Sequence, residues 1–373
     1  MRLVEARRES LPVRLLKWLK LDPLLLLLLG LLMTLSCLVL FSAGGGNIDL
    51  VLRQLVRFGV AIGVMLFVAQ ITPHALKLWS PWIYAVGVSM LIAVAVIGVT
   101  GKGAQRWLDL GFMRFQPSEV LKLAAPMMVA WYLGDRALPP TVRQVLVSLV
   151  IITVPMLLIM DQPDLGTALL VGSAAFFALF LAGLSVRLLL AGGGLALIAA
   201  PIMWFFVMHD YQKQRVLTFL NPESDPLGSG YHIIQSKIAI GSGGVMGKGW
   251  MNGSQSQLDF LPEQSTDFIF SVFGEEFGLV GSLLLLLLYV LVLARCLRIA
   301  SRAQDSYARL LAGSISLTFF VYLFVNIGMV SGLLPVVGVP LPMVSYGGTS
   351  VVTLAAGFGM LMSVNANKRL MNR

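Results

Sequence analysis

Charged residues are scarce in this sequence of 373 residues. They make up 12% of it, about half of the roughly 25% that soluble domains carry. Hydrophobic residues make up 57%, and the mean hydropathy is +0.86. This composition excludes an ordinary soluble domain and predicts a polytopic membrane protein with an all-α fold.

Cysteine and histidine are scarce too. Cys37 lies inside the first apolar run and Cys296 in a basic segment, which is neither a disulfide framework nor a metal-ligand spacing. His209 and His232 have no HxxxH or HExxH spacing. These patterns argue against a zinc site and against thiol redox chemistry. The short connections expected inside the cell also lack a Gly-rich phosphate cradle, which argues against a nucleotide-driven motor.

Basic residues outnumber acidic ones by 27 to 18, for a formal net charge of +9. They cluster beside apolar runs, where they indicate membrane orientation rather than nucleic-acid binding. The N-terminal basic cluster places the N-terminus inside. The first apolar run is too long for a signal peptide, so we expect it to be retained as a helix.

Ten apolar runs have roughly the length of about 20 residues that spans a bilayer. They are 24–42, 56–72, 81–99, 118–133, 144–160, 165–184, 187–208, 267–294, 309–331 and 345–366. We expect one integral membrane domain, 1–373, with cytoplasmic tails at 1–23 and 367–373. The connection 209–266 is expected to be a large extracytoplasmic loop between helices 7 and 8.

The unusual polar segments all fall on the expected outer face. They are 101–122, 161–167, the loop 209–266 and 335–350. Four connections therefore converge on one side of the membrane, and we expect the functional site there.

Asp267 stands at the outer end of the eighth run, in the stretch LPEQSTDFIF. Charge at a membrane span is expensive and usually has a partner or a function. Phe268 and Phe270 limit hydration of the carboxylate, which suits a general base. The plain alternative is that Thr266 or Asp267 caps the helix, and both roles remain open.

Glu119 and Lys122 are three residues apart at the start of the fourth run, so they share a helix face and can pair. A purely structural pair and a functional one are equal alternatives. Pro117 suits the first position of that helix. Upstream, Arg106 followed by Trp107 is typical of a membrane anchor or of a clamp on an anionic lipid head group.

Other charged residues have simpler alternatives. Arg215 and Lys237 lie in the long loop, whose glycine-rich GSGGVMGKGW fits a phosphate-binding turn or, more commonly, a flexible surface loop. Asp164, in DQPDLGT, is favoured as a helix cap. Glu275 and Glu276 lie within the eighth run, and as neighbours on a helix they cannot both face one partner.

Seven motifs, in one order along nearly the whole chain, resemble those of the SEDS family (shape, elongation, division and sporulation). They are KGAQRWLDLG, RFQPSE with Lys122, QPDLGT, HDYQKQRVLTFLNPESDPLGSGYHIIQSKIAIGSGG, GKGW, LPEQSTDFIFSVFGEEFG and PVVGVPLPMVSYGGTS. The compact tails and the VVGVPLP run look more like the elongation members than the division members.

The resemblance implies a ten-helix SEDS fold and a peptidoglycan glycosyltransferase that polymerises lipid II during cell elongation and rod-shape maintenance. It assigns the essential carboxylate to Asp267 and a buried ion pair to Glu119 and Lys122, and it marks Trp107 as functionally sensitive. It also implies a class B penicillin-binding protein, a transpeptidase, as partner, together with other membrane proteins of the rod complex. The location implied is the bacterial cytoplasmic (inner) membrane.

On this interpretation Asp267 is the base for an inverting reaction that forms a β-1,4 linkage and releases undecaprenyl diphosphate. The cations expected to offset phosphate charge are Arg106, Arg215, Lys237 and Lys122. Substrate contacts are also expected from Trp107 and Glu119, and second-tier ones from Glu263, Asp164, Ser345 and Tyr346. No cofactor is certain, and a divalent cation, Mg²⁺ or Mn²⁺, remains open.

Three alternatives compete with this interpretation. A lipid II flippase or other transporter would place its site near the midplane on broken helices in repeated halves, whereas the polar segments here gather at the outer face. A division-specific member of the family is the second alternative. The third is a scaffold for a partner synthase, which would keep its activity after Asp267→Asn.

Overall fold

The structure is a computed structural model that describes most of the chain. The described residues are 19–101, 104–109, 111, 114–208, 210–224, 228–258, 260, 261 and 263–367. Most of the predicted tails, 1–23 and 367–373, lies outside these residues, and so does His209.

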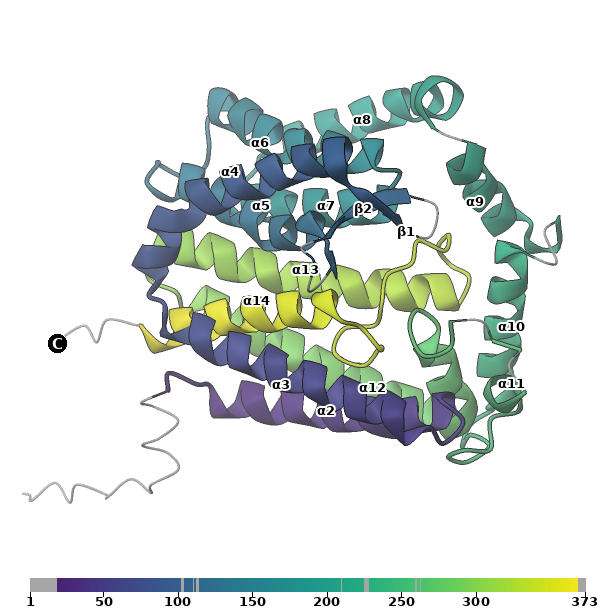
Figure 1. Cartoon of the computed structure of the whole chain (residues 1–373). Coiled ribbons are helices and arrows are strands. Elements are labelled where there is room, and N and C mark those ends of the chain that lie inside the picture. Colours follow the sequence, from purple (N-terminus) through teal and green to yellow (C-terminus); the bar gives the residue numbers. More distant parts are fainter. Residues whose placement is uncertain are drawn as a thin grey trace, which may run out of the picture.

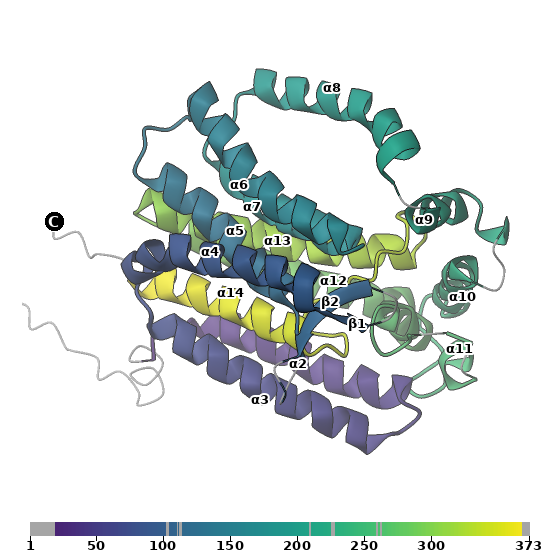
Figure 2. The ribbon, with the colours of Figure 1, turned by 45° about the horizontal axis from the view of Figure 1, so that its top comes forward.

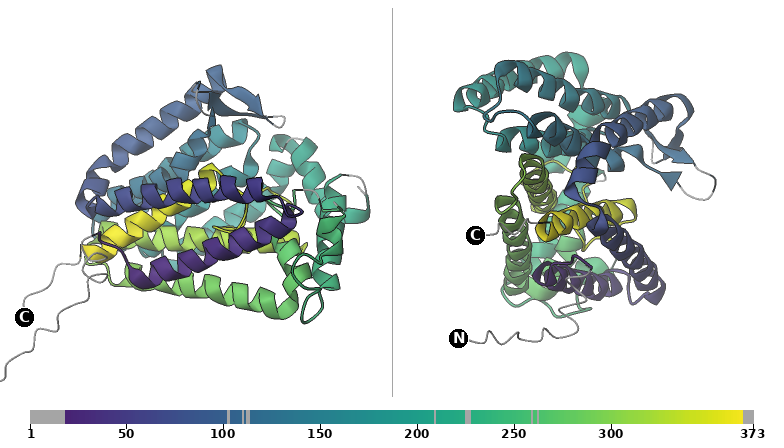
Figure 3. Two further views of the ribbon diagram at one scale, coloured as in Figure 1. Left: turned by 60° about the horizontal axis from the view of Figure 1, so that its bottom comes forward. Right: turned by 90° about the vertical axis from the view of Figure 1, so that its left-hand side faces the viewer.

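Long helices form one bundle with their axes roughly aligned, so the bundle has two ends (Figures 1 and 3). They are α2 (Pro23–Ala43), α3 (Ile48–Gln70), α4 (Pro73–Ile97), α5 (Pro117–Gly134), α6 (Val142–Asp161), α7 (Leu165–Leu181), α8 (Val186–Ile202), α12 (Ile269–Ser301), α13 (Ser306–Val330) and α14 (Thr349–Ala366). Figure 2 shows α8 at the edge of the bundle, and none of its residues is buried.

Eight of these helices are long and apolar enough to cross a membrane, which confirms an integral membrane protein. The other two predicted runs, 118–133 and 165–184, also form helices, α5 and α7. With 17 residues, α7 is short for a span, and α5 carries Glu119 and Lys122 in its first two turns. The two helices contact each other and both pack against α6 and α13, and α5 also packs against α4.

The prediction of an all-α fold is wrong in one place. Three short strands form a small antiparallel sheet: β1 (Val99–Gly101), β2 (Ala104–Asp109) and β3 (Arg114–Phe115). Trp107 pairs with Val99, and Leu108 pairs with Phe115. The sheet fixes the backbone of a segment that the sequence indicated only as a polar connection, and it holds Arg106 and Trp107 above the start of α5.

The connection between α8 and α12 is largely helical. A π-helical stretch, Met203–Val207, follows α8, and then come α9 (Asp210–Leu220), a 3₁₀ turn (Pro222–Ser224), α10 (Ser229–Ser242) and α11 (Ser254–Gln257). Figure 1 shows α9, α10 and α11 in a column beside one end of the bundle. The Ser236 hydroxyl donates to the carbonyl of Val330 at 2.6 Å, which ties α10 to the end of α13.

A glycine breaks α12 and explains the two carboxylates inside it. Gly278 has φ 65° and ψ −161°, which no helix contains. The 33 residues of α12 would span about 50 Å if straight, whereas the hydrocarbon core is about 30 Å thick. The segment after Gly278 is long enough to cross alone. Glu275 and Glu276 therefore lie in the leg before the break, not in the middle of a membrane span.

The glycine-rich stretch docks against this break. The amides of Lys248 and Gly249 donate to the carbonyls of Glu275 and Glu276, at 3.0 and 2.9 Å. Both carboxylates are buried: Glu275 accepts from Lys248 Nζ at 2.6 Å, and Glu276 accepts from the Ser42 hydroxyl at the end of α2. The stretch is thus packed against α12 through its backbone and Lys248.

A shared carboxylate ties the other end of the bundle. Asp22 is 1% exposed and caps α2 by accepting from the Leu25 amide at 2.9 Å. Its two oxygens also accept from Arg295 of α12, at 3.1 and 2.5 Å, and from Asn365 of α14 at 2.8 Å. One side chain therefore joins three helices.

Gly247→Ala tests the docking of the glycine-rich stretch. A Cβ at Gly247 would lie 2.1 Å from the carbonyl oxygen of Glu276, and its φ is +81°. Gly244 has a similar φ of +57° but open space around it, so Gly244→Ala is the matched control. Both variants bear the left-handed strain, and Gly247→Ala should lose about 1–3 kcal/mol more from overpacking. Thermal unfolding in detergent measures the difference, and equal midpoints would contradict the docked arrangement.

Candidate active site

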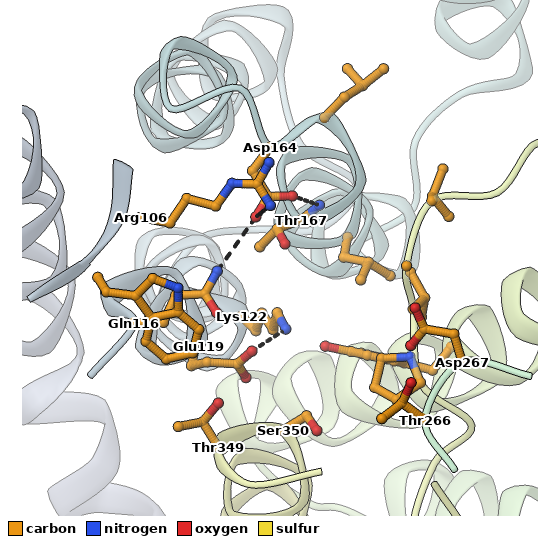
Figure 4. Close-up of a pocket in the computed structure, with 18 of the residues that line it drawn as sticks. Arg106, Gln116, Glu119, Lys122, Asp164, Thr167, Thr266, Asp267, Thr349 and Ser350 are labelled. Atoms are coloured by element: carbon orange, nitrogen blue, oxygen red, sulfur yellow. Dashed lines mark hydrogen bonds and ion pairs between the residues drawn. The ribbon is translucent and has the colours of Figure 1, made fainter. Parts of the chain in front are cut away.

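A cavity of about 910 Å³ opens at the end of the bundle away from the two ends of the described chain. Its wall comes from β2, the first turns of α5, α7 and α14, the turn before α12, and the connection between α13 and α14. Figure 4 shows Arg106 and Asp164 on one side, Glu119 and Lys122 between, and Asp267 opposite. Four segments far apart in the sequence thus meet at one site, as the orientation argument predicted.

Asp267 lines the cavity from the turn that precedes α12. The N-cap residue of α12 is Phe268, and no side chain caps it. The prediction that Thr266 or Asp267 caps this helix is therefore wrong. The backbone of Gly338 passes beside the carboxylate, since a Cβ there would lie 3.5 Å from Asp267 Oδ2.

An asparagine in α13 fixes the backbone at Asp267. Asn326 is fully buried, and its amide donates to the carbonyl of Asp267 at 2.9 Å and to that of Val339 at 2.7 Å. One side chain thereby joins the turn that carries Asp267 to the connection that lines the opposite part of the wall. Asn326 was not among the residues singled out from the sequence, although a polar side chain inside an apolar run usually has a partner or a function.

The connection before α14 holds the same turn from the other side. The Ser345 hydroxyl donates to the carbonyl of Thr266 at 2.5 Å, and the Tyr346 amide donates to that of Ser265 at 2.8 Å. Ser345 is buried and supports the turn without lining the cavity, whereas Tyr346 lines it. Glu263, which is exposed, also lines it and accepts from the Thr266 hydroxyl at 2.9 Å.

Glu119 and Lys122 form the predicted ion pair, with 2.7 Å between Nζ and Oε1. Each is 6% exposed, and both line the cavity. Pro117 occupies the first turn of α5, as predicted. Lys122 Nζ also lies 5.4 Å from the ring centroid of Tyr322 in α13, and the second Glu119 oxygen has no hydrogen-bond partner among the described residues. The pair therefore leaves one buried acceptor without a partner among the described residues.

Asp164 is the predicted cap of α7 and also lines the cavity. It caps α7 by accepting from the Thr167 amide at 3.2 Å, and it lines the cavity. Its other oxygen lies 3.5 Å from Arg106 Nη1 and accepts from Gln116 at 3.4 Å. Arg106 also donates to the carbonyls of Gln162 and Pro163, at 3.2 and 2.5 Å. The guanidinium is thus held in one orientation at the rim.

The two basic residues of the long connection, Arg215 and Lys237, lie in different places relative to the cavity. Arg215, in α9, lines the cavity together with Trp107 of β2. Lys237, in α10, does not line it: its side chain lies over Gly332, where a Cβ would be 2.2 Å from Lys237 Cε. Sequence alone had no means to distinguish them, because both belong to one polar connection. Lys237 therefore gets no support as a substrate contact.

Several lining residues were not singled out from the sequence. Gln116, Thr167, Thr349 and Ser350 lie within motifs that the sequence analysis quoted, but Tyr322 lies inside an apolar run. Within the described ranges, no three histidine, cysteine, aspartate or glutamate side chains gather as metal ligands would.

Comparisons with known proteins agree with this architecture. Residues 17–370 match the FtsW/RodA/SpoVE family, described as cell cycle protein. The chain is 53% identical over 355 residues to the peptidoglycan glycosyltransferase MrdB of Escherichia coli K12, covering 95% of each. It is similar to a chain in a structure named "Structural coordination of polymerization and crosslinking by a peptidoglycan synthase complex", with a TM-score of 0.81, 30% identity and coverage of 94% and 98%. It is also similar to the crystal structure of the rod shape determining protein RodA of Thermus thermophilus, with a TM-score of 0.71 and 28% identity. That match covers 93% of this chain and 97% of the RodA chain.

The buried pair yields a stability prediction. Lys122→Met leaves the Glu119 carboxylate buried without its cation, which should lower stability by about 3–5 kcal/mol. The double variant Glu119→Gln/Lys122→Met removes both charges and should regain most of that loss. Thermal unfolding of the purified protein compares the three. A Lys122→Met variant as stable as the unaltered protein would show that the carboxylate is well hydrated instead.

Proposed function

The chain belongs to the FtsW/RodA/SpoVE family, and from this premise we propose that the cavity is the site at which lipid II units are joined into glycan strands. The protein is a peptidoglycan glycosyltransferase of the RodA type, as its 53% sequence identity to MrdB over 95% of each chain indicates. The observation that carries the proposal is the placement of Asp267. Its carboxylate faces the same cavity as two cations and a buried ion pair.

Asp267 acts as the general base. It accepts the proton of the 4-hydroxyl of the acceptor GlcNAc, and that oxygen attacks C1 of the donor sugar. The bond between C1 and the phosphate oxygen breaks, and its electron pair leaves with undecaprenyl diphosphate. Attack from the face opposite the leaving group converts the α-linked donor into a β-1,4 linkage. The donor is already activated, so no nucleotide is required.

Cations of the wall offset the charge of the leaving diphosphate. Arg106 is held at the rim by two carbonyls and Asp164, so its remaining N–H groups are pre-oriented, which is how fixed donors stabilise developing charge. Arg215 approaches from α9. Lys122 is already paired with Glu119, and a substrate phosphate competes with Glu119 for it. Trp107 contacts the substrate from β2.

The bundle, with eight helices that are long and apolar enough to cross a membrane, supports a placement in the membrane. We propose that α5 and α7 cross together with the eight apolar helices, ten in all, with the described chain's two ends on the cytoplasmic side of the inner membrane. The cavity then faces outward, where the lipid-linked sugars are presented, and α9, α10 and α11 belong to an extracytoplasmic loop. The concentration of basic residues in connections at the other end supports this orientation.

A transpeptidase is the proposed partner. The similar chain in the structure named for a peptidoglycan synthase complex supports it, since that name couples polymerisation with crosslinking. The transpeptidase of elongation is a class B penicillin-binding protein, and other membrane proteins of the rod complex are expected nearby.

Asp267→Asn should abolish polymerisation while leaving the fold intact. An amide cannot accept the proton, and loss of a general base lowers kcat by about 10²–10⁴. Labelled lipid II given to the purified protein with its partner, in the presence of penicillin, measures chain formation. Asp49→Asn is the matched control, because Asp49 is an exposed aspartate of α3 that does not line the cavity, and it should retain most of the activity. Chains made by Asp267→Asn would refute the base, and lipid II transport without polymerisation would favour a flippase.

A second comparison separates the two loop cations. Arg215→Gln should raise the KM for lipid II about tenfold, because a charged contact to a diphosphate contributes roughly 1.5 kcal/mol or more. Lys237→Gln removes the same charge from the same connection but outside the cavity, and its KM should stay within twofold. Initial rates over a range of lipid II concentrations give both values. The reverse ranking would show that α10, not α9, supplies the phosphate contact.

A further inference from the structure

Tyr346 occupies an unusual position in the cavity wall because a cation covers one face of its ring. The Arg57 guanidinium carbon lies 3.9 Å from the centroid of the Tyr346 ring. Tyr346 lines the cavity, whereas Arg57 is not among the lining residues. A guanidinium of α3 therefore covers one face of an aromatic ring whose residue lines the cavity.

The charge of Arg57 has no other evident use. No described carboxylate lies within ion-pair distance of it, and its Nη1 is buried without a hydrogen-bond partner among the described residues. Arg57 is half-buried, and burying one of its N–H groups without a hydrogen bond is expensive. Stacking on an aromatic face recovers part of that cost, about 0.5–2 kcal/mol. The ring is thus held by an interaction that constrains its plane.

The backbone of Tyr346 is fixed on both sides. Its amide donates to the carbonyl of Ser265, two residues before Asp267, at 2.8 Å. On the other side, Gln54 of α3 is fully buried and donates to the carbonyl of Ser345 at 3.3 Å. Gln54 and Arg57 are three residues apart and so share one face of α3. Through these two residues α3 contacts the backbone at Ser345 and the ring of Tyr346. Both belong to the connection that hydrogen-bonds to the turn before α12.

A flat aromatic ring in the same cavity as a carboxylate base suits a sugar. One face of a pyranose ring consists of C–H groups, which pack on an aromatic face while the equatorial hydroxyls remain free for hydrogen bonds. The other aromatic walls, Trp107 and Tyr322, come from β2 and α13 and lack a direct tie to the Asp267 turn in the contacts described above.

We propose that Tyr346 is a stacking platform for the pyranose ring that presents its hydroxyl to Asp267, and that Arg57 is a positioning residue acting through Tyr346. The proposal rests on the glycosyltransferase function described above. It assigns a role in sugar binding to α3, which contributes no residue to the cavity wall.

Four variants test it through the KM for lipid II. Tyr346→Phe keeps the ring and should stay within twofold of the unaltered protein. Tyr346→Leu removes the aromatic face and should raise KM about three- to tenfold, the size expected for one aromatic contact, with kcat changed less. Arg57→Gln should raise KM about threefold, and Arg57→Lys, which keeps a cation over the ring, should restore most of the loss.

The double variant Arg57→Gln/Tyr346→Leu decides whether Arg57 acts through the ring. If it does, Arg57→Gln costs nothing further once the ring is gone. If Arg57→Gln raises the KM equally in the unaltered protein and in Tyr346→Leu, the positioning role is overturned and Arg57 contacts the phosphate directly. A Tyr346→Leu variant with an unaltered KM, or with only kcat reduced, overturns the platform. Thermal unfolding accompanies each variant, and the two Tyr346 variants decide the platform by themselves if Arg57→Gln does not fold.

The outcome is distinguishable from a failure of the proposed mechanism. Asp267→Asn that still polymerises, together with a raised KM in Tyr346→Leu, would refute the base and leave the platform standing. An inactive Asp267→Asn variant together with an unaltered KM in Tyr346→Leu would support Asp267 as the base and refute the platform.

Discussion

The site depends on one buried amide. Asn326 donates to the carbonyls of Asp267 and Val339, and these two backbone groups belong to segments that otherwise have no regular hydrogen-bonded structure to hold them. An unpaired carbonyl in the interior costs a few kcal/mol, so the amide favours the one arrangement in which both are satisfied. That arrangement brings the turn before α12 against the connection between α13 and α14. The wall of the cavity is the result.

Buried charge follows the same logic elsewhere in the bundle. Glu119, Glu275 and Asp22 are each almost inaccessible, and each has a cation within 2.7 Å. A buried pair contributes little net stability, but losing one partner is costly. Asp22 with Arg295 joins two helices and Glu275 with Lys248 joins α12 to the glycine-rich stretch, whereas Glu119 and Lys122 pair within α5. Asp267 differs from these three because it is partly exposed to the cavity, where a substrate can reach it.

The sequence was sufficient for the helices and for the end of the bundle that carries the site. Hydropathy marks spans because lipid imposes their length, and alternating connections then place Asp267, Asp164 and Arg106 on one face. It was not sufficient for features set by contacts between distant segments. The break at Gly278, the small three-stranded sheet and the departure of Lys237 from the cavity all depend on backbone or side-chain packing across long sequence separations. The same holds for the cap at α12, where local preference favoured Asp267 and the tertiary contacts placed Phe268 instead.

The shared carboxylate at the opposite end has a consequence for biogenesis. Asp22 begins the first described membrane helix, while its partners Arg295 and Asn365 stand 273 and 343 residues later. During synthesis α2 enters the bilayer long before either partner exists, so its terminal carboxylate must stay at the water interface. Only when α14 has been inserted can the first and last helices be joined. Completion of the fold is thereby postponed to the end of translation, and a chain shortened before Asn365 would lack the contact that closes the bundle.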